Sequence, residues 1–278
     1  MVERRQLERD QQAVSLKRLI LFLFLAHLGV GIAFTLVFVS REAGVKFFRF
    51  NAGLAAILIA IALAFRRTGP FGPAEWALVM SEAAIVWYWA TVGRSQARLR
   101  PAIMTVAVGG GLMAVVLQAF AISSGGTVSM TFLTAASFLS SAALLGGTCT
   151  AMILGHWYLV IPSLEVRHLQ SIVKVQIAST VVRIVVVGAA VFAGLALREA
   201  APAAGSFRHY ITSLDGIFFW QRVLFGLAGP AVLSYLTWET AKIRSTQSAT
   251  GILYVDCFTV VVGEVLAKYL LLATRVPL

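Results

Sequence analysis

The chain of 278 residues has little charge, because Asp, Glu, Lys and Arg together make up only 13% of it. In a soluble domain about a quarter of the residues are commonly charged, since the surface is hydrated. Hydrophobic residues account for 59% of this chain, and apolar runs long enough to cross a hydrocarbon layer of about 30 Å recur throughout it. These proportions exclude a soluble globular protein. We therefore expect an all-α fold, a polytopic integral membrane bundle.

Cysteine is also scarce. Cys149 and Cys257 lie far apart inside apolar runs, which indicates neither a disulfide framework nor a metal knuckle, and we interpret each as a small core residue. No His or carboxylate pair has metal-ligand spacing, so we expect no metal site. A cleavable signal peptide is not apparent either, because the first apolar run is too long and no small-residue cleavage site follows it.

Eight apolar segments are long enough to be membrane-spanning helices. A polar arm of mixed charge, residues 1–15, precedes them, and residues 16–278 are expected to form a single transmembrane helical domain. Residues typical of loops, among them Gly, Pro and Ser, occupy the breaks between the segments. The predicted spans run from about 18–40, 50–66, 75–93, 102–123, 130–161, 169–197, 217–239 and 250–274.

The net charge of +11 comes from basic residues at the ends of apolar segments and not from a basic stripe. Such flanks indicate contact with membrane lipid and no nucleic-acid partner, and we expect a bacterial cytoplasmic membrane. Eight spans place both termini on one side, and both sides carry equal numbers of basic residues, so the positive-inside rule leaves the orientation open. We call the side opposite the termini the basic face. Its residues are Arg41, Lys46, Arg49, Arg94, Arg98, Arg100, Arg167, Lys174, Lys242 and Arg244.

Ionisable residues inside the spans are candidates for function, because each costs about 2.5 to 3.5 kcal/mol in a hydrocarbon layer. Arg183 and Glu264 lie near the middle of the sixth and eighth spans, so they can pair across the bundle. Lys268 follows Glu264 by one turn, in the favourable order for an i,i+4 pair. This polar core is either a structural ion pair or a site that transfers protons or steers an anionic or quinoid group. The candidates are His27, Glu82, His156, Arg183, Arg222, Glu239, Asp256, Glu264 and Lys268.

At the basic face, three helix ends carry polar and aromatic residues at similar depth. His156 and Tyr158 end the fifth span, Glu239 ends the seventh, and Tyr254 and Asp256 begin the eighth. We predict a quinone site there, with His156 exchanging protons and the other four residues hydrogen-bonding the headgroup. The alternative is an interfacial imidazole bonded to a backbone carbonyl beside aromatic belt residues.

The fifth span carries a polar stripe, which is expected to face inward, where it packs closely or lines a cavity. A membrane haem b needs two imidazoles at matched depth, and His27 and His156 lie nearer opposite faces, which disfavours it. His168 and His209 lie in or beside loops and are expected to be solvated. The stripe comprises Thr134, Ser137, Ser141, Thr148, Met152 and His156.

The last span contains the sequence FTVVVGEVLAKYLLL, residues 258–272. It resembles the final helix of membrane-anchor subunits of the dimethyl sulfoxide reductase type, which often carry a Gly-Glu followed by Arg or Lys and an aromatic residue. The matching positions here are Gly263, Glu264, Lys268 and Tyr269, and the span count and length are similar as well. The resemblance implies an anchor subunit without its own haem or metal, which passes electrons between the quinone pool and a docked iron-sulfur partner of a catalytic complex.

The leading hypothesis is therefore a quinone-interacting anchor subunit of an oxidoreductase, which need not be catalytic itself. The first alternative is a secondary transporter for a small solute, in which Arg183 binds an anion and Glu264 couples protons. A membrane cytochrome bearing haem b is a further alternative.

Overall fold

The computed structural model describes residues 2–66, 69–94, 98–161, 165–198, 207–213 and 216–278, without the side chains of residues 2–10, 12, 197–198 and 208–209. Throughout this part of the chain all regular structure is helical, which confirms the predicted all-α class. The elements are α1 (Val2–Thr35), η1 (Leu36–Phe38), η2 (Arg41–Ala43), α2 (Gly44–Phe65), α3 (Pro73–Thr91), α4 (Arg100–Ile122), α5 (Val128–Val160), α6 (Val166–Arg198), α7 (Phe207–Thr212), α8 (Ile217–Val223), η4 (Leu224–Ala228), α9 (Gly229–Lys242) and α10 (Thr246–Thr274).

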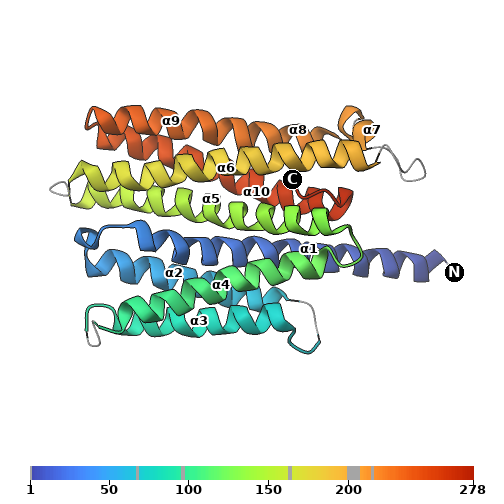
Figure 1. Ribbon diagram of the computed structural model, residues 1–278, viewed down its shortest axis with the longest axis horizontal. Coiled ribbons are helices and arrows are strands. Elements are labelled where there is room, and N and C mark those ends of the chain that lie inside the picture. Colours follow the sequence, from blue (N-terminus) through green and yellow to red (C-terminus); the bar gives the residue numbers. More distant parts are fainter. Residues whose placement is uncertain (1, 67–68, 95–97, 162–164, 199–206, 214–215) are drawn as a thin grey trace.

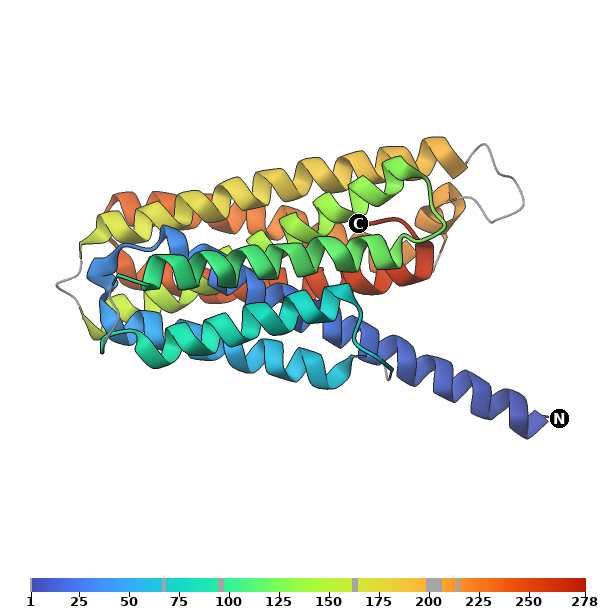
Figure 2. The ribbon, with the colours of Figure 1, turned by 60° about the horizontal axis from the view of Figure 1, so that its bottom comes forward.

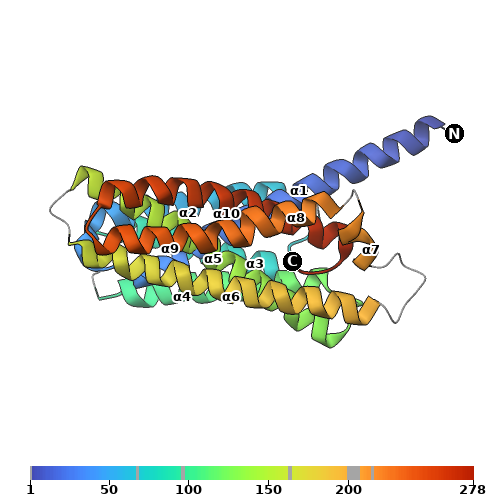
Figure 3. The ribbon, with the colours of Figure 1, turned by 90° about the horizontal axis from the view of Figure 1, so that it is seen from above.

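The long helices form two antiparallel groups of four that lie side by side (Figure 1). In the first bundle α1, α2, α3 and α4 each contact the next, and α4 closes the ring against α1. In the second bundle α5, α6, α9 and α10 form a ring in the same way, with α9 lying between α10 and α6 in Figure 3. The two bundles meet mainly where α1 packs against α5.

Within the described residues seven helices, and not the eight that we predicted, are long and apolar enough to span a membrane. The expected span at 75–93 forms α3, but this helix of 19 residues contains Glu75, Glu82 and several Trp and Tyr residues, which lower its mean hydropathy. It still lies along α4 in the direction of the other helices (Figure 1). The seven candidate spans are Ala13–Phe38, Arg41–Phe65, Arg100–Ile122, Val128–Val160, Val166–Ala196, Ile217–Lys242 and Thr246–Thr274.

The exterior of the helices is apolar, as a lipid environment requires. Large hydrophobic side chains such as Met113, Val185 and Phe258 are more than half exposed on their helices. A soluble protein rarely exposes continuous apolar surface of this kind. The chain is therefore an integral membrane protein whose outer side chains face lipid.

The connections gather at two opposite ends of the molecule (Figure 1). The turns α1–α2, α3–α4, α5–α6 and α9–α10 lie together at one end, so the residues of the basic face do share a face. The N-terminal arm is the first part of α1 and projects from the other end (Figure 2), which we call the terminal face. After α10 the chain folds back, and the side chains of Val276 and Leu278 are buried.

The seam between the bundles is a close contact of α1 with α5 at Gly31 and Gly146. A Cβ atom on either glycine would run into the backbone of the opposite helix. Small residues that allow helix backbones to touch are a common basis of helix association in membranes. Glycine is therefore needed at both positions for packing and not for backbone conformation.

We expect Gly146→Val to lower the free energy of unfolding by about 1–3 kcal/mol, because the added side chain forces α5 away from α1. Thermal unfolding of the protein in mild detergent measures this change. Gly188→Ala on α6 is the control, since a Cβ there meets open space. Equal unfolding temperatures for the two variants would contradict the close contact.

Candidate functional site

Four charged side chains meet inside the second bundle. Arg183 comes from α6, Arg222 from α8, and Glu264 and Lys268 from α10, and each is at most 1% exposed. Apolar runs place these helices in the membrane, so the charges lie in a medium where an isolated ion is costly. We call these four residues the ion cluster.

Glu264 is the centre of the ion cluster, because both of its oxygens accept hydrogen bonds. Its Oε1 accepts from Arg183 Nε and from Arg222 Nη2, both at 2.9 Å. Its Oε2 accepts from Arg183 Nη2 at 3.1 Å and from Ser141 Oγ at 2.5 Å. The Lys268 Nζ lies 3.7 Å from the same oxygen. The structure thus contains both of the contacts expected from the sequence, Arg183 with Glu264 and Lys268 with Glu264.

The polar stripe on α5 supplies the remaining partners. Arg183 Nη1 donates to the main-chain oxygen of Ser137 at 2.9 Å and to its hydroxyl at 2.8 Å. Lys268 Nζ donates to the Ser141 hydroxyl at 2.7 Å. Thr134 and Thr148 on the same stripe are also buried. The stripe faces inward through these residues as predicted, although His156 at its end is exposed.

Arg222 is the member of the ion cluster for which we predicted no role. Its Nε and Nη1 have no hydrogen-bond partner in the part of the chain that the structure describes, although the side chain is fully buried. The guanidinium lies against Gly226, in a π-helical segment, and close to Gly263 of α10. Single π-helical turns inside α-helices are rare and are frequently found at functional sites.

The formal charges of the ion cluster do not balance, because three cationic side chains share the carboxylate of Glu264. A main-chain oxygen of Leu278 accepts from Arg183 Nη2 at 3.1 Å and gives partial compensation. The unpartnered nitrogens of Arg222 raise the free energy of the fold, since a buried donor without an acceptor loses its hydrogen bonds to water and gains none in return. Within the described residues the ion cluster therefore combines unpartnered N–H donors with a formal surplus of positive charge.

The predicted quinone site is not assembled as we expected. His156 Nδ1 and the Tyr254 hydroxyl lie 2.9 Å apart at the exposed end of α5 and α10. The Tyr158 hydroxyl instead bonds the main chain at the start of α6. It donates to the main-chain oxygen of Glu165 at 2.5 Å and accepts from the Leu169 amide at 3.1 Å.

The two carboxylates expected at that site also point elsewhere. Glu239 pairs with Lys242 at 2.7 Å on the surface of α9. Asp256 is buried and accepts a hydrogen bond from Gln176 of α6. Residues at the same depth in the membrane can point in different directions around their helices. The prediction used depth alone, and it therefore grouped residues whose side chains bond different partners.

The structure also places most of the histidines and both cysteines that the sequence singled out. His168 is not solvated as expected, because it is buried with Nε2 2.7 Å from Glu42 Oε2, and the side chain of His209 lies outside the described residues. Cys149 and Cys257 are free thiols, and they interact with each other across α5 and α10. His27 is fully buried, with its ring edge-on to Phe138 at 4.7 Å. Within the described residues no group of three or more His, Cys, Asp or Glu could hold a metal ion.

No protein-family model matches the chain, and no curated protein is significantly similar to it. The resemblance of the last helix to anchor subunits of the dimethyl sulfoxide reductase type therefore stays a prediction.

We expect Arg183→Met to lower the free energy of unfolding by about 3–5 kcal/mol, because Glu264 would lose two donors while it remains buried. Denaturant titration in detergent micelles measures the change. Arg167→Met is the matched control, since Arg167 pairs with Glu42 and Glu165 on the exposed basic face, where solvent screens the interaction. A loss no larger than that of the control would show that the buried pair adds little.

Proposed function

We propose that this protein is a membrane carrier of small anions, in which the ion cluster binds the anion and Glu264 couples its movement to protons. The observation that carries the proposal is the buried guanidinium of Arg222, two of whose nitrogens lack an acceptor beside a surplus of positive charge. We further propose that it works in a bacterial cytoplasmic membrane.

The donor groups favour an oxyanion, such as a carboxylate, as the substrate. Guanidinium groups are weakly hydrated and present several N–H donors in a plane, which suits carboxylate and phosphate oxygens. Arg222 offers its Nε and Nη1, and Lys268 adds an ammonium group that donates to Ser141 near Glu264. All four side chains of the ion cluster are at most 1% exposed, which favours a small solute.

Protons would be coupled through competition for the same donors. With Glu264 ionised, its oxygens occupy Arg183 and one nitrogen of Arg222. A proton on a Glu264 oxygen removes the negative charge and frees those donors, so a substrate anion binds together with the proton. When the proton leaves, the carboxylate regains the guanidinium groups and expels the anion. The expected stoichiometry is one proton carried with each anion, because Glu264 is a single carboxylate.

We expect the purified protein in liposomes to accumulate a labelled anion when the outside is made acidic, and Arg222→Gln to reduce the initial rate at least tenfold. Lactate, succinate, sulfate and phosphate serve as probes of anion size and charge. Arg94→Gln is the control, because Arg94 is exposed in the α3–α4 turn and should leave the rate unchanged. Failure of the unaltered protein to move any of these anions would contradict a carrier of small oxyanions.

The Glu264→Gln variant separates binding from coupling. It keeps the shape of the side chain and mimics the protonated carboxyl, so anion exchange across the membrane should persist while accumulation driven by the proton gradient is lost. If the variant still accumulates anions in response to an acidic exterior, Glu264 is not the coupling group.

A second candidate is the quinone-interacting subunit of a redox complex, favoured by the contact between His156 and Tyr254. An imidazole and a phenol at the membrane boundary can exchange protons with a quinone headgroup. The docked partner would then be an iron-sulfur subunit, as the resemblance of the last helix implies.

For this candidate we expect an iron-sulfur protein to co-purify in mild detergent, and the complex to oxidise reduced quinone. Tyr254→Phe and His156→Ala should each lower that turnover about tenfold. Tyr235→Phe is the matched control, because Tyr235 is exposed on α9 away from any predicted site. Purification of the chain without a partner, or unchanged turnover in His156→Ala, would remove the candidate.

A further inference from the structure

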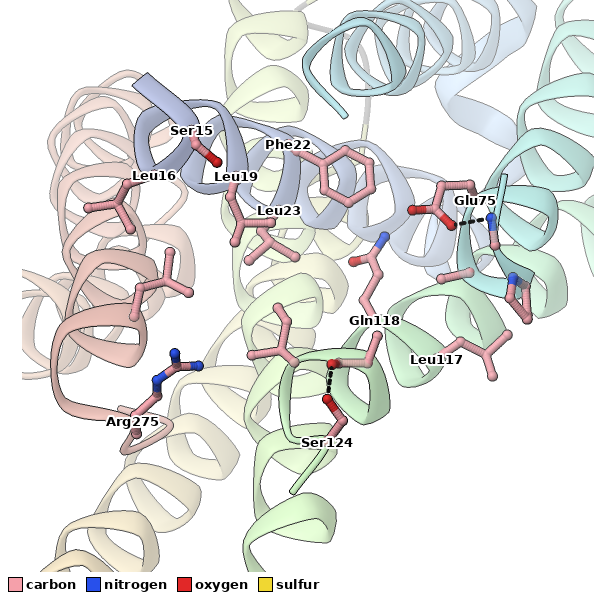
Figure 4. A pocket seen from close by; sticks show the side chains of 16 residues that line it. Ser15, Leu16, Leu19, Phe22, Leu23, Glu75, Leu117, Gln118, Ser124 and Arg275 are labelled. Atoms are coloured by element: carbon pink, nitrogen blue, oxygen red, sulfur yellow. Dashed lines mark hydrogen bonds between the residues drawn. The ribbon is translucent and has the colours of Figure 1, made fainter. Parts of the chain in front are cut away.

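A cavity of about 870 Å³ opens at the terminal face between α1, α3, α4 and α10 (Figure 4). Glu75, Ser124 and Arg275 supply polar groups to its lining, and Leu19, Leu117 and Leu272 supply apolar walls. A space of this size with charged groups holds water readily. It therefore brings solvent from the terminal face into the first bundle.

Gln118 of α4 is the polar residue that continues this cavity into the interior. Its side chain extends from α4 toward α1 among the lining residues (Figure 4). It is 3% exposed, and neither its amide nitrogen nor its oxygen has a hydrogen-bond partner within the described ranges. Buried amides are nearly always satisfied, so we assign the missing partners to the neighbouring His27 ring and to water in the cavity.

His27 of α1 lies next to Gln118, near enough for the two side chains to interact. Both of its ring nitrogens lack a partner of hydrogen-bonding geometry in the described part of the chain. The charged groups that act on it are Lys268 and Glu264 from α10 and Arg183 from α6. His27 therefore stands between the cavity and the ion cluster.

Phe138 of α5 marks the boundary between His27 and the ion cluster. The His27 ring packs edge-on to it at 4.7 Å, and the Lys268 ammonium lies 5.0 Å from its centroid. His27 belongs to the first bundle and Lys268 to the second, and the ring of Phe138 contacts both.

We propose that the terminal-face cavity, Gln118 and His27 form a hydrated passage through which protons travel between the terminal face and Glu264. This inference rests on the proposed coupling role of Glu264. Water in the cavity gives a proton to one ring nitrogen of His27, the other nitrogen releases its proton through water, and a Glu264 oxygen receives it. The imidazole returns to its starting state by tautomer exchange, so it acts as a relay and is not consumed.

The entrance can be tested without any transport assay. In a Cys149→Ala/Cys257→Ala background, we expect Leu117→Cys to react with a membrane-impermeant cationic thiosulfonate at least ten times faster than Phe120→Cys. Both positions lie on α4 within one turn, but Leu117 lines the cavity and Phe120 is exposed on the lipid side. Equal reaction rates would overturn the hydrated entrance.

The relay is tested by exchange of the imidazole C2 hydrogen for deuterium, followed by mass spectrometry. We expect His27 to exchange despite its burial, within tenfold of the exposed His156, and Gln118→Leu to slow it at least fivefold. Gln170→Leu is the control, because Gln170 bonds Ala241 near the basic face. A His27 that does not exchange, or that is unaffected by Gln118→Leu, would overturn the passage.

A final measurement joins the passage to the proposed function. His27→Leu should lose proton-driven anion accumulation at least tenfold while keeping anion exchange, and unchanged accumulation would overturn the relay. If the unaltered protein moves no anion, the carrier function fails and the relay to Glu264 fails with it. If Leu117→Cys then still reacts and His27 still exchanges, the protein has a water-filled inlet without the carrier function. The failure of the passage and the failure of the carrier function can therefore be told apart.

Discussion

The second bundle is organised around one carboxylate. Glu264 lies on α10 and receives donors from α5, from α6 and from α8, which continues through η4 into α9. A single buried anion therefore connects all four sides of that bundle. Removing any donor would leave charge in a medium that cannot solvate it, which makes the relative positions of these helices strongly coupled. Three cationic side chains share this carboxylate, so its bonds hold the helices around a formal surplus of positive charge.

Much of the fold follows from the sequence, because the length of an apolar run determines whether a helix can cross the membrane. The pairing of Arg183 with Glu264 could be predicted as well, since opposite charges near the middle of two spans have no better partners available. The exception was α3, where Glu82 and aromatic residues reduce the hydropathy of a helix that still packs along α4.

The site residues were harder to predict because depth along a helix says nothing about direction around it. Tyr158 and His156 are two residues apart on α5, yet one bonds the α5–α6 turn and the other meets Tyr254 at the surface. Arg222 lies near the start of the predicted span 217–239, where no charged partner was expected. Its contact with Glu264 depends on how η4 and the close approach of Gly226 and Gly263 place α8 against α10. Such long-range geometry leaves no local pattern.

The seam between the bundles is where a transport cycle would act. Gly31 and Gly146 let α1 and α5 touch, and Phe138 on α5 contacts His27 on one side and Lys268 on the other. The first bundle thus carries the buried His27 and the second carries the ions, with one ring in contact with both. Under the proposed relay, a change in the packing of α1 against α5 would alter the distance between His27 and the ion cluster. The donors to Glu264 come from α5, α6 and α8, so such a change would leave their bonds in place, whereas the hydrogen bond between the Thr35 and Thr150 hydroxyls would break.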